Sequence, residues 1–309
     1  MQNGTIGSGK MLSEPGNSMD VKQEKWPTFL IIGVAKAGTT SLWGYLKQHP
    51  EVFVSPIKET NYFAYDGSDT STFSGHRAHN QFPIKTRDEY LALFSGAAQA
   101  LAVGEVSPLY IESPVAADRI RRDLPRVRLI AILRNPADRA VSDYQMWVRS
   151  NRASRHLESE FGVDRHVVRV GFYFEKLKRY FDRFPREQIN VSLFDDLRKD
   201  ALGFVRGIYR FLGVDPAFEP DVAVRYATGR IPRNSTLHAI LSKARDSALL
   251  RSTTPVRVQN LFRALRDRNT DRDFKLPDPL RARLLELYRD DVLRVGDLIR
   301  KDLSHWLTT

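Results

Sequence analysis

The 309-residue sequence contains no cysteine, and this absence excludes three kinds of chemistry. Disulfide bridges, metal sites built from thiolates and cysteine nucleophiles all require a residue that is missing. The sequence also has no uninterrupted apolar run of about 20 residues, the length that a membrane-spanning helix needs. These absences suit a reducing compartment, so we expect a cytoplasmic protein without a transmembrane segment.

Residues 1–25 lack the apolar core that a signal peptide requires. They read "MQNGTIGSGKMLSEPGNSMDVKQEK", a polar composition that is typical of a flexible leader. Over the whole chain, 42% of the residues are hydrophobic and 28% are charged, which is ordinary for a globular protein with a core. No clear boundary divides the remainder, so we expect residues 26–309 to form a single domain.

Acidic residues are the minority among the charged ones, because 48 lysines and arginines face 37 aspartates and glutamates. The resulting net charge of +11 and isoelectric point near 9.8 predict an anionic partner, either a nucleic acid, an acidic surface or a multiply charged small ligand. In the last third, stretches such as "RVQNLFRALRDRNTDRDFK" mix arginine with aspartate and carry few aromatics. That pattern favours a solvated helical face over a nucleic-acid-binding face, which stays the alternative.

Apolar runs alternate with helical patterns along the chain, which predicts an α/β fold with a mainly parallel central sheet flanked by helices. Thr86, Asn135 and Gly213 stand where helix caps are expected. The apolar run 127–134 has the composition of a central parallel strand. We expect strands at 29–34, 101–106, 127–134 and 189–194, and helices at 39–48, 87–94, 113–124, 135–150, 172–184, 201–213 and 278–303.

The segment "GVAKAGTTS" joins the first expected strand to the first helix and resembles a phosphate-binding loop with a displaced lysine. Gly33 and Gly38 have the separation of a Walker loop, and Thr40 stands at its Ser/Thr position. The lysine position, however, holds Thr39, and Lys36 comes three residues earlier. A strand that turns into a helix through glycines still offers free N–H groups and the positive end of the helix dipole, so we expect a phosphate there.

The strand at 127–134 lacks the terminal aspartate that a magnesium-dependent nucleotide site would need and ends in Arg134 instead. A cation there repels magnesium and attracts a second phosphate. Ser142 follows eight residues later on the next helix and could share that phosphate, with Arg139 as a further candidate. Two phosphate positions and no metal indicate a nucleoside bisphosphate. A metal-dependent P-loop kinase or NTPase is the alternative, and it would place a lysine directly after Gly38.

The segment "GVAKAGTTSLWGYLKQHPEVF", followed by "KETNYF", is similar to the 5′-phosphosulfate loop of the sulfotransferase family. "LRNPADRAVSDY" resembles the 3′-phosphate motif of that family, and the similarity extends over residues 27–307. The carbohydrate, heparan-sulfate-type branch and its bacterial relatives are the most similar in pattern. The resemblance implies a P-loop-type three-layer sandwich that uses the donor 3′-phosphoadenosine 5′-phosphosulfate (PAPS) without a metal. It also implies in-line transfer of the sulfuryl group to a hydroxyl or amine of a small molecule, such as a saccharide, glycolipid or natural product.

The resemblance also implies roles for individual residues. The loop that holds the 5′-phosphosulfate corresponds to Lys36, Ala37, Gly38, Thr39, Thr40 and Ser41, and the 3′-phosphate pair corresponds to Arg134 and Ser142. Tyr173 matches a family tyrosine near the nucleotide. Arg230 and Arg233 fall in a loop that the family places over the nucleotide. Glu59 matches the general base, Lys36 neutralises the leaving group, and Lys58, Asn61 and Ser107 are candidates for acceptor binding.

Two positions qualify this assignment. His49 corresponds in type to the base of the branch that acts on small phenols, but it precedes Pro50 at a helix end and is expected to cap or pack. Val106 stands where some members carry a lysine that binds the sulfate, and Lys58 or a loop arginine could replace that lysine. Glu59 without the resemblance would read equally well as a surface glutamate paired with Lys58.

Overall fold

The computed structural model describes residues 25–67, 82–97, 99–150, 153–154, 156–223, 231–232, 270–271 and 274–308. Residues 1–24 of the expected leader lie outside this part, as do Arg230 and Arg233. The described residues contain a five-stranded parallel sheet in the order β2-β3-β1-β4-β5. Its strands are β1 (Phe29–Gly33), β2 (Val52–Val54), β3 (Ala102–Val106), β4 (Arg128–Leu133) and β5 (Ile189–Leu193). The prediction of an α/β fold around a parallel sheet is therefore confirmed.

The central strand β1 owes its position to its continuous apolar sequence, "FLIIG", in which every residue is buried. A strand covered by helices on both faces has no polar side, which is the usual pattern in parallel sheets. Leu30 pairs with Glu105 of β3 on one side and with Leu129 of β4 on the other. This register places the carboxyl ends of β1, β3 and β4 at one edge of the sheet.

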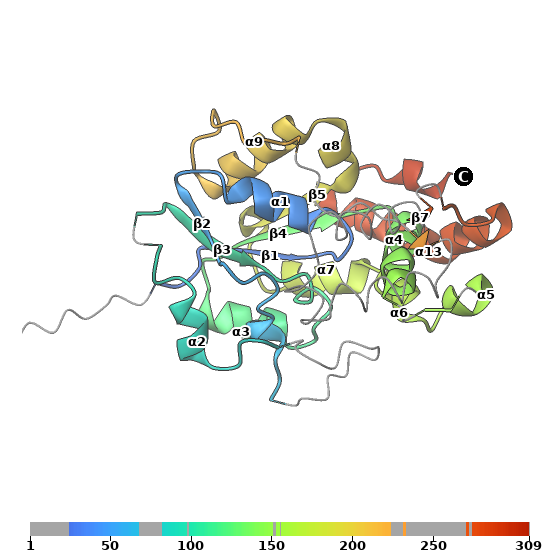
Figure 1. The fold of residues 1–309 in the computed structure, drawn as a ribbon, viewed down its shortest axis with the longest axis horizontal. Coiled ribbons are helices and arrows are strands. Elements are labelled where there is room, and N and C mark those ends of the chain that lie inside the picture. The colour runs from blue at the N-terminus through green and yellow to red at the C-terminus, as the bar shows by residue number, and fades with distance from the viewer. Residues whose placement is uncertain are drawn as a thin grey trace, which may run out of the picture.

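Helices pack on both faces of the sheet (Figure 1), as the three-layer prediction requires. In Figure 1, α1, α8 and α9 lie above the sheet and α3 and α7 below it, while α4 and α13 lie beyond the carboxyl ends of the strands. The helices are α1 (Thr39–Leu46), α2 (Arg87–Ala92), α3 (Ala116–Asp123), α4 (Pro136–Arg149), α5 (Leu157–Glu160), α6 (His166–Arg169), α7 (Phe174–Phe181), α8 (Phe194–Lys199), α9 (Ala201–Leu212) and α13 (Asp278–Ile299). Short 3₁₀ turns are η1 (Tyr62–Ala64), η2 (Arg186–Gln188) and η3 (Ser304–Leu307), and β6 (Ile231–Pro232) pairs antiparallel with β7 (Thr270–Asp271).

The three expected caps stand at helix ends, Thr86 and Asn135 at N-termini and Gly213 at a C-terminus. Thr86 forms a capping box with Glu89, because its hydroxyl accepts from Glu89 N and the Glu89 carboxylate accepts from Thr86 N. The Asn135 side chain accepts hydrogen bonds from the first-turn amides of α4 at 3.0 and 3.2 Å. Gly213 ends α9 with a left-handed φ of 74°. Local sequence chemistry therefore accounts for where these helices begin or end.

The strand order reverses at the carboxyl end of β1, the position where open parallel sheets form a ligand-binding crevice. The chain leaves β1 toward β2 and β3 on one side of the sheet, and β4 and β5 lie on the other. Ligands of open parallel sheets bind where the strand order reverses in this way. The loops that follow β1, β2, β3 and β4 meet at this edge, and they carry most of the residues that the sequence singled out.

Candidate functional site

The loop between β1 and α1 is held in a shape that requires glycine at one position. Lys36 and Gly38 both have left-handed backbone, with φ of 73° and 90°. Gly38 is the N-cap residue of α1 and provides no side-chain cap, so its turn exposes the helix N-terminus. A Cβ atom on Gly38 would lie 2.7 Å from Leu197 Cδ2 and 3.0 Å from Phe194 Cδ2. Helix α8 therefore packs directly against the loop.

Gly38→Ala is expected to lower the free energy of unfolding by about 2–4 kcal/mol, because it adds left-handed strain and overpacks the contact with α8. Thermal and denaturant unfolding measure this loss. Gly207→Ala is the matched control, since a Cβ on Gly207 meets nothing within 4 Å in helix α9. The control should be neutral or more stable by up to about 1 kcal/mol. Equal stability of Gly38→Ala and the wild-type protein would contradict the described packing.

The remaining loop residues lie on the first turn of α1 or just before it. Ala37 is fully buried, and its amide donates to Val34 O at 3.3 Å. Thr39 is buried, whereas Thr40 and Ser41 are half-buried. The hydroxyl residues expected at the 5′-phosphosulfate are thus gathered at the helix N-terminus, where the dipole favours an anion.

Arg134 connects the end of β4 to this loop. Its Nη1 donates to Lys36 O at 3.1 Å, and its Cζ lies 4.7 Å from the centre of the Phe194 ring. The Tyr173 hydroxyl donates to Arg134 O at 2.8 Å and so braces the strand end from below. Burial lowers the pKa of Arg134 from its usual value, but a guanidinium stays charged at neutral pH. A cation therefore stands where a metal-dependent nucleotide site would place a carboxylate.

Lys36 reaches toward α4, where its Nζ donates to Met146 Sδ at 3.7 Å. Met146 lies one turn after Ser142, which is half-buried on the same helix. The pKa of Lys36 is lowered to about 8, mainly by burial; the charge of Asp143 opposes this shift and nearby arginines add to it. The lysine loop and the Arg134–Ser142 segment, about 100 residues apart in sequence, are thus brought to one place.

The segment after β2 places Glu59 at the same edge of the sheet. Its amide donates to Val106 O at 2.8 Å, and its side chain is 44% exposed. The Lys58 ammonium donates to Glu59 Oε1 at 2.5 Å. The carboxylate is therefore both ion-paired and open to solvent, which combines the two interpretations that the sequence allowed.

Three other predicted site residues lie behind this surface. Tyr173 is fully buried, and its amide donates to Asp291 Oδ2 at 2.7 Å. Asn61 and Ser107 are also buried, and Asn61 N donates to Ser107 Oγ at 3.1 Å. The hydroxyl of Ser107, a candidate for acceptor binding, is engaged inside the protein, where it donates to Glu105 Oε2 at 2.7 Å.

His49 has a structural role, as its place beside a proline indicated. It is buried, with Nε2 2.9 Å from Asp215 O, and its Nδ1 accepts from Glu51 N at 3.1 Å. Its ring packs edge-on against Tyr209, with a centroid separation of 4.5 Å. Both ring nitrogens are occupied by backbone groups, so the side chain is held away from the chemistry.

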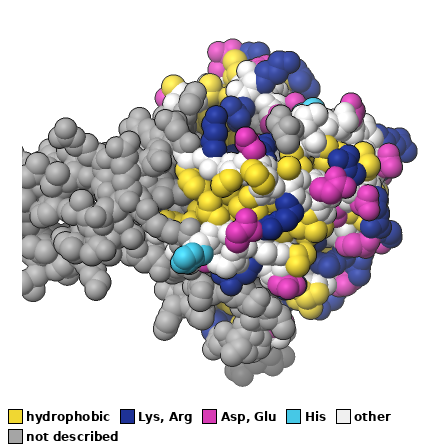
Figure 2. Space-filling view, turned by 90° about the vertical axis from the view of Figure 1, so that its right-hand side faces the viewer, with side chains coloured by type: hydrophobic (Ala, Val, Ile, Leu, Met, Phe, Trp, Pro, Cys, Tyr) yellow, Lys and Arg dark blue, Asp and Glu magenta, His cyan; other side chains and the backbone are white. Residues whose placement is uncertain are grey.

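The face of the molecule on the α13 side shows charged side chains of both signs around an apolar area (Figure 2). Arginines of α13 pair with carboxylates of other elements, including Arg281 with Asp138 at 2.7 Å and Arg294 with Glu175 at 2.9 Å. The basic stretch 257–275, which we expected to form a solvated helical face, lies largely outside the described residues. No helix among the described residues is long and apolar enough to cross a membrane. The cytoplasmic location stays a prediction.

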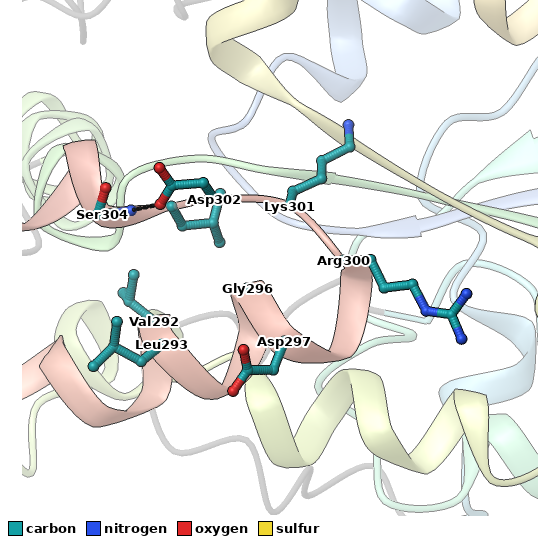
Figure 3. Close-up of a pocket in the computed structure, with 9 residues that line it drawn as sticks. Val292, Leu293, Gly296, Asp297, Arg300, Lys301, Asp302 and Ser304 are labelled. Atoms are coloured by element: carbon teal, nitrogen blue, oxygen red, sulfur yellow. Dashed lines mark hydrogen bonds between the residues drawn. The ribbon is translucent and has the colours of Figure 1, made fainter.

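A cavity of about 500 Å³ lies at the end of α13 and holds no residue of the predicted site (Figure 3). Figure 3 shows Arg300 and Lys301 pointing away from each other, and Ser304 N donates to Asp302 Oδ1 at 2.8 Å. In the described ranges, no group of three or more histidines and carboxylates could hold a metal ion. The crevice at β1 therefore stays the candidate site.

A sulfotransferase domain model matches residues 27–228, about two thirds of the chain. The chain belongs to the sulfotransferase family. Over 219 residues it is 28% identical to the bifunctional heparan sulfate N-deacetylase/N-sulfotransferase 2 of Bos taurus, covering 66% of this chain but 24% of that protein. Over 205 residues it is 26% identical to the heparan sulfate glucosamine 3-O-sulfotransferase 5 of Mus musculus, covering 62% of this chain and 55% of that one.

A solved sulfotransferase from Alicyclobacillus acidocaldarius has the same architecture. It aligns with a TM-score of 0.70 at 29% identity and covers 92% of this chain and 100% of its own. The predicted family and the predicted P-loop-type sandwich are thus confirmed. The matched region contains the lysine loop, Glu59, Arg134 and Ser142, but not Arg230 or Arg233.

Arg134→Ala is the variant that tests the 3′-phosphate position of this sulfotransferase-family site. We expect affinity for adenosine 3′,5′-bisphosphate to fall about 10- to 100-fold, the usual effect of losing a hydrogen bond to a charged group. Affinity for 5′-AMP, which lacks the 3′-phosphate, should change less than about threefold. Arg210→Ala, an exposed arginine on α9, is the control. Calorimetric titration measures both ligands, and equal losses for both would contradict the assignment.

Several residues that shape the site were missed by sequence reasoning. Phe194 and Leu197 pack against Gly38, and Met146 contacts Lys36. Asn135 Nδ2 donates to Trp306 O at 2.8 Å, and Trp306 Nε1 donates to Asp195 Oδ2 at 2.6 Å. The C-terminal turn η3 therefore fastens the start of α4 and of α8. Glu105, which binds Ser107, was missed as well. Its charge inside an otherwise apolar strand was a signal that the sequence offered.

Proposed function

We propose that the protein transfers the sulfuryl group of PAPS to a hydroxyl or amine of a saccharide, glycolipid or natural-product acceptor by in-line displacement. The observation that carries this proposal is the contact between Arg134 and the lysine loop, with Arg134 Nη1 3.1 Å from Lys36 O. This contact brings the two proposed phosphate positions, the lysine loop and Arg134, next to each other at the end of β4. Two such positions suit a nucleoside 3′,5′-bisphosphate better than a magnesium-bound triphosphate, which would need a carboxylate there.

The described residues fit this donor, which supplies an activated sulfuryl group and a phosphate leaving group. The exposed N-terminus of α1 and the hydroxyls of Thr39, Thr40 and Ser41 favour a 5′-phosphosulfate. Arg134 and Ser142 supply a cation and a donor for the 3′-phosphate. The loop backbone over Lys36 to Gly38 is fixed by packing against α8, so its donors need little reorganisation when charge develops.

Lys36 is the residue that we assign to the leaving group. Its ammonium neutralises negative charge as the bond to the 5′-phosphate breaks, together with loop N–H groups. Its pKa of about 8 reflects a partly buried environment, in which a charge interacts more strongly with an anion than it would in water. In the described state it rests on a thioether, a weak partner that a phosphate oxygen would outcompete.

Glu59 is the residue that we assign to the acceptor proton. The carboxylate is partly exposed to solvent and paired with Lys58, which keeps it oriented. Val106 is fully buried, so the position that carries a lysine in some relatives offers no charge to the crevice here. Lys58 is the nearest described replacement, since its ammonium lies beside the base.

The acceptor class rests on the relatives. Two of them are named for sulfation of heparan sulfate, at nitrogen in one case and at a 3-hydroxyl of glucosamine in the other. A saccharide amine or hydroxyl is therefore the first acceptor to test. No feature described above favours a nucleic-acid partner, because the arginines of α13 are paired with carboxylates.

The proposal is tested by incubating the protein with ³⁵S-labelled PAPS and a panel of acceptors, without added metal. The panel contains N-deacetylated heparosan for amines, chemically desulfated heparan for hydroxyls, and a glycolipid. Transfer of label to at least one acceptor supports the proposal. Absence of transfer together with magnesium-dependent ATP hydrolysis would favour the kinase or NTPase alternative.

A further inference from the structure

Glu105 is a fully buried carboxylate on β3, directly behind the segment that carries Glu59. Four hydroxyl groups donate to it. Thr60 Oγ1 and Ser107 Oγ each lie 2.7 Å from its Oε2, and the Tyr90 hydroxyl lies 3.0 Å from its Oε1. The Tyr110 hydroxyl also donates to Oε1. Two carboxylate oxygens have about four acceptor directions in total, so the described donors fill them.

Glu105 places an ionisable carboxyl group at a buried strand position where an apolar side chain would pack equally well. Burial raises the pKa of Glu105, and the four hydroxyl donors oppose that rise by favouring the ionised form. None of these four donors is a cation, so the desolvation of the carboxylate is offset by hydrogen bonds alone. Burying a carboxylate in a sheet is unfavourable unless its hydrogen bonds are satisfied. An apolar side chain at this position would avoid that penalty.

The hydrogen bonds of Glu105 lead to Thr60 and, through Ser107, to the backbone of Asn61. Ser107, which donates to Glu105, accepts from Asn61 N at 3.1 Å. Thr60 binds Glu105 through its own side chain. Glu59 N donates to Val106 O at 2.8 Å, next to Glu105 along β3. The turn from Glu59 to Asn61 is thus attached at three points, two on β3 and one on Ser107, the residue that follows β3.

That turn has an uncommon backbone. Glu59 and Asn61 have φ of 62° and 53°, in the left-handed region that residues with a side chain seldom occupy. Such conformations persist when the surrounding structure determines them, and they are found most often at functional sites. The contacts that hold this turn are the backbone hydrogen bond from Glu59 to Val106 and the side-chain hydrogen bonds that link Thr60 and Asn61 to Glu105, the latter through Ser107.

We infer that Glu105 is a positioning residue, which fixes the direction of the Glu59 side chain through Thr60 and Ser107. The inference rests on the proposed role of Glu59 as the base. Glu105 takes no proton from the acceptor and does not contact it, since it is fully buried. It sets the backbone turn, and the turn aims the carboxylate of Glu59 into the crevice.

Two isosteric variants separate this role from a structural one. Thr60 and Tyr90 are both fully buried, and each donates one hydrogen bond to Glu105, but only Thr60 belongs to the turn. Thr60→Val and Tyr90→Phe each remove one hydroxyl. Glu105→Gln is a third variant, in which the amide nitrogen donates where the carboxylate accepted, so it cannot accept all four hydrogen bonds.

The first measurement is hydrogen exchange of the amides in residues 58–63, which needs no acceptor. We expect exchange to become about tenfold faster in Thr60→Val and Glu105→Gln, the effect of one lost hydrogen bond on local opening. In Tyr90→Phe it should change less than about twofold, although its melting temperature falls as much as that of Thr60→Val. Equal exchange in Thr60→Val and Tyr90→Phe would overturn the inference, and this comparison holds even if Glu105→Gln does not fold.

The second measurement is transfer of ³⁵S from PAPS to N-deacetylated heparosan. In Thr60→Val, kcat should fall about 10- to 100-fold, because a small displacement of a reacting group has an effect of that size. The KM for PAPS and the affinity for adenosine 3′,5′-bisphosphate should stay within about twofold. Tyr90→Phe should keep kcat. If the wild-type protein binds no bisphosphate, the proposed function fails, while the exchange data still decide whether Glu105 holds the turn.

Discussion

Lys36→Met is expected to lower the rate of sulfuryl transfer by about 10²–10³-fold, the usual loss when one donor to a developing oxyanion is removed. Methionine keeps the length and apolar character of the side chain, so packing against Met146 should survive. The effect should fall mainly on kcat, since the ammonium acts most strongly when charge develops on the leaving oxygen. Transfer of label from PAPS to an accepting saccharide measures it.

Lys36 also predicts a pH dependence. Because its pKa is about 8 in the free protein, the ammonium is charged below that pH and neutral above it. Affinity for adenosine 3′,5′-bisphosphate should therefore fall as the pH rises through about 8 in the wild-type protein and stay flat in Lys36→Met. Lys47→Met is the control, an exposed lysine after the other end of α1 whose ammonium lies 4.2 Å from the centre of the Trp43 ring. A Lys36→Met protein that transfers sulfate at the normal rate would remove Lys36 from the mechanism.

Glu59→Gln is expected to reduce transfer by about 10²–10⁴-fold, the range attributed to a general base. Glutamine retains the shape of the side chain but cannot accept the proton of the acceptor. Affinity for the bisphosphate should be unchanged, because the role that we propose for Glu59 concerns the acceptor and not the nucleotide. Parallel measurement of turnover and of bisphosphate binding separates the two effects.

Glu175→Gln is the matched control for this variant. Glu175 is also a surface glutamate in an ion pair, 2.9 Å from Arg294, but it lies on α7 away from the crevice. Loss of that pair should leave turnover within about twofold, since exposed ion pairs contribute little. Normal turnover in Glu59→Gln would show that another group takes the proton.

Features set by neighbouring residues could be predicted from the sequence. The apolar runs of β1 and β4 and the caps at Thr86, Asn135 and Gly213 depend on local chemistry, so their positions agree with expectation to within a residue or two. Strand β2 was missed because it has three residues, too few for a period to show. The four-residue helices α5 and α6 were missed for the same reason.

The same distinction between local and long-range features applies to the candidate site. Lys36, Glu59 and Arg134 could be proposed from the sequence because each stands in a motif whose residues are close together in the chain. The Glu105 cluster was not found, since its hydroxyl donors come from separate segments and meet only in the folded chain. The link from Asn135 to Trp306 spans 171 residues and was equally invisible. The sequence also does not reveal that the hydroxyl of Ser107, a candidate for acceptor binding, donates to Glu105.

The most direct test of the central claim is calorimetric titration of the wild-type protein with adenosine 3′,5′-bisphosphate, 5′-AMP and ATP, each with and without magnesium. The two phosphate positions predict tight binding of the bisphosphate that is independent of magnesium. They also predict that 5′-AMP binds at least about tenfold more weakly, because the contribution of Arg134 is lost. Binding of ATP with magnesium in preference to the bisphosphate would contradict the assignment of a PAPS site.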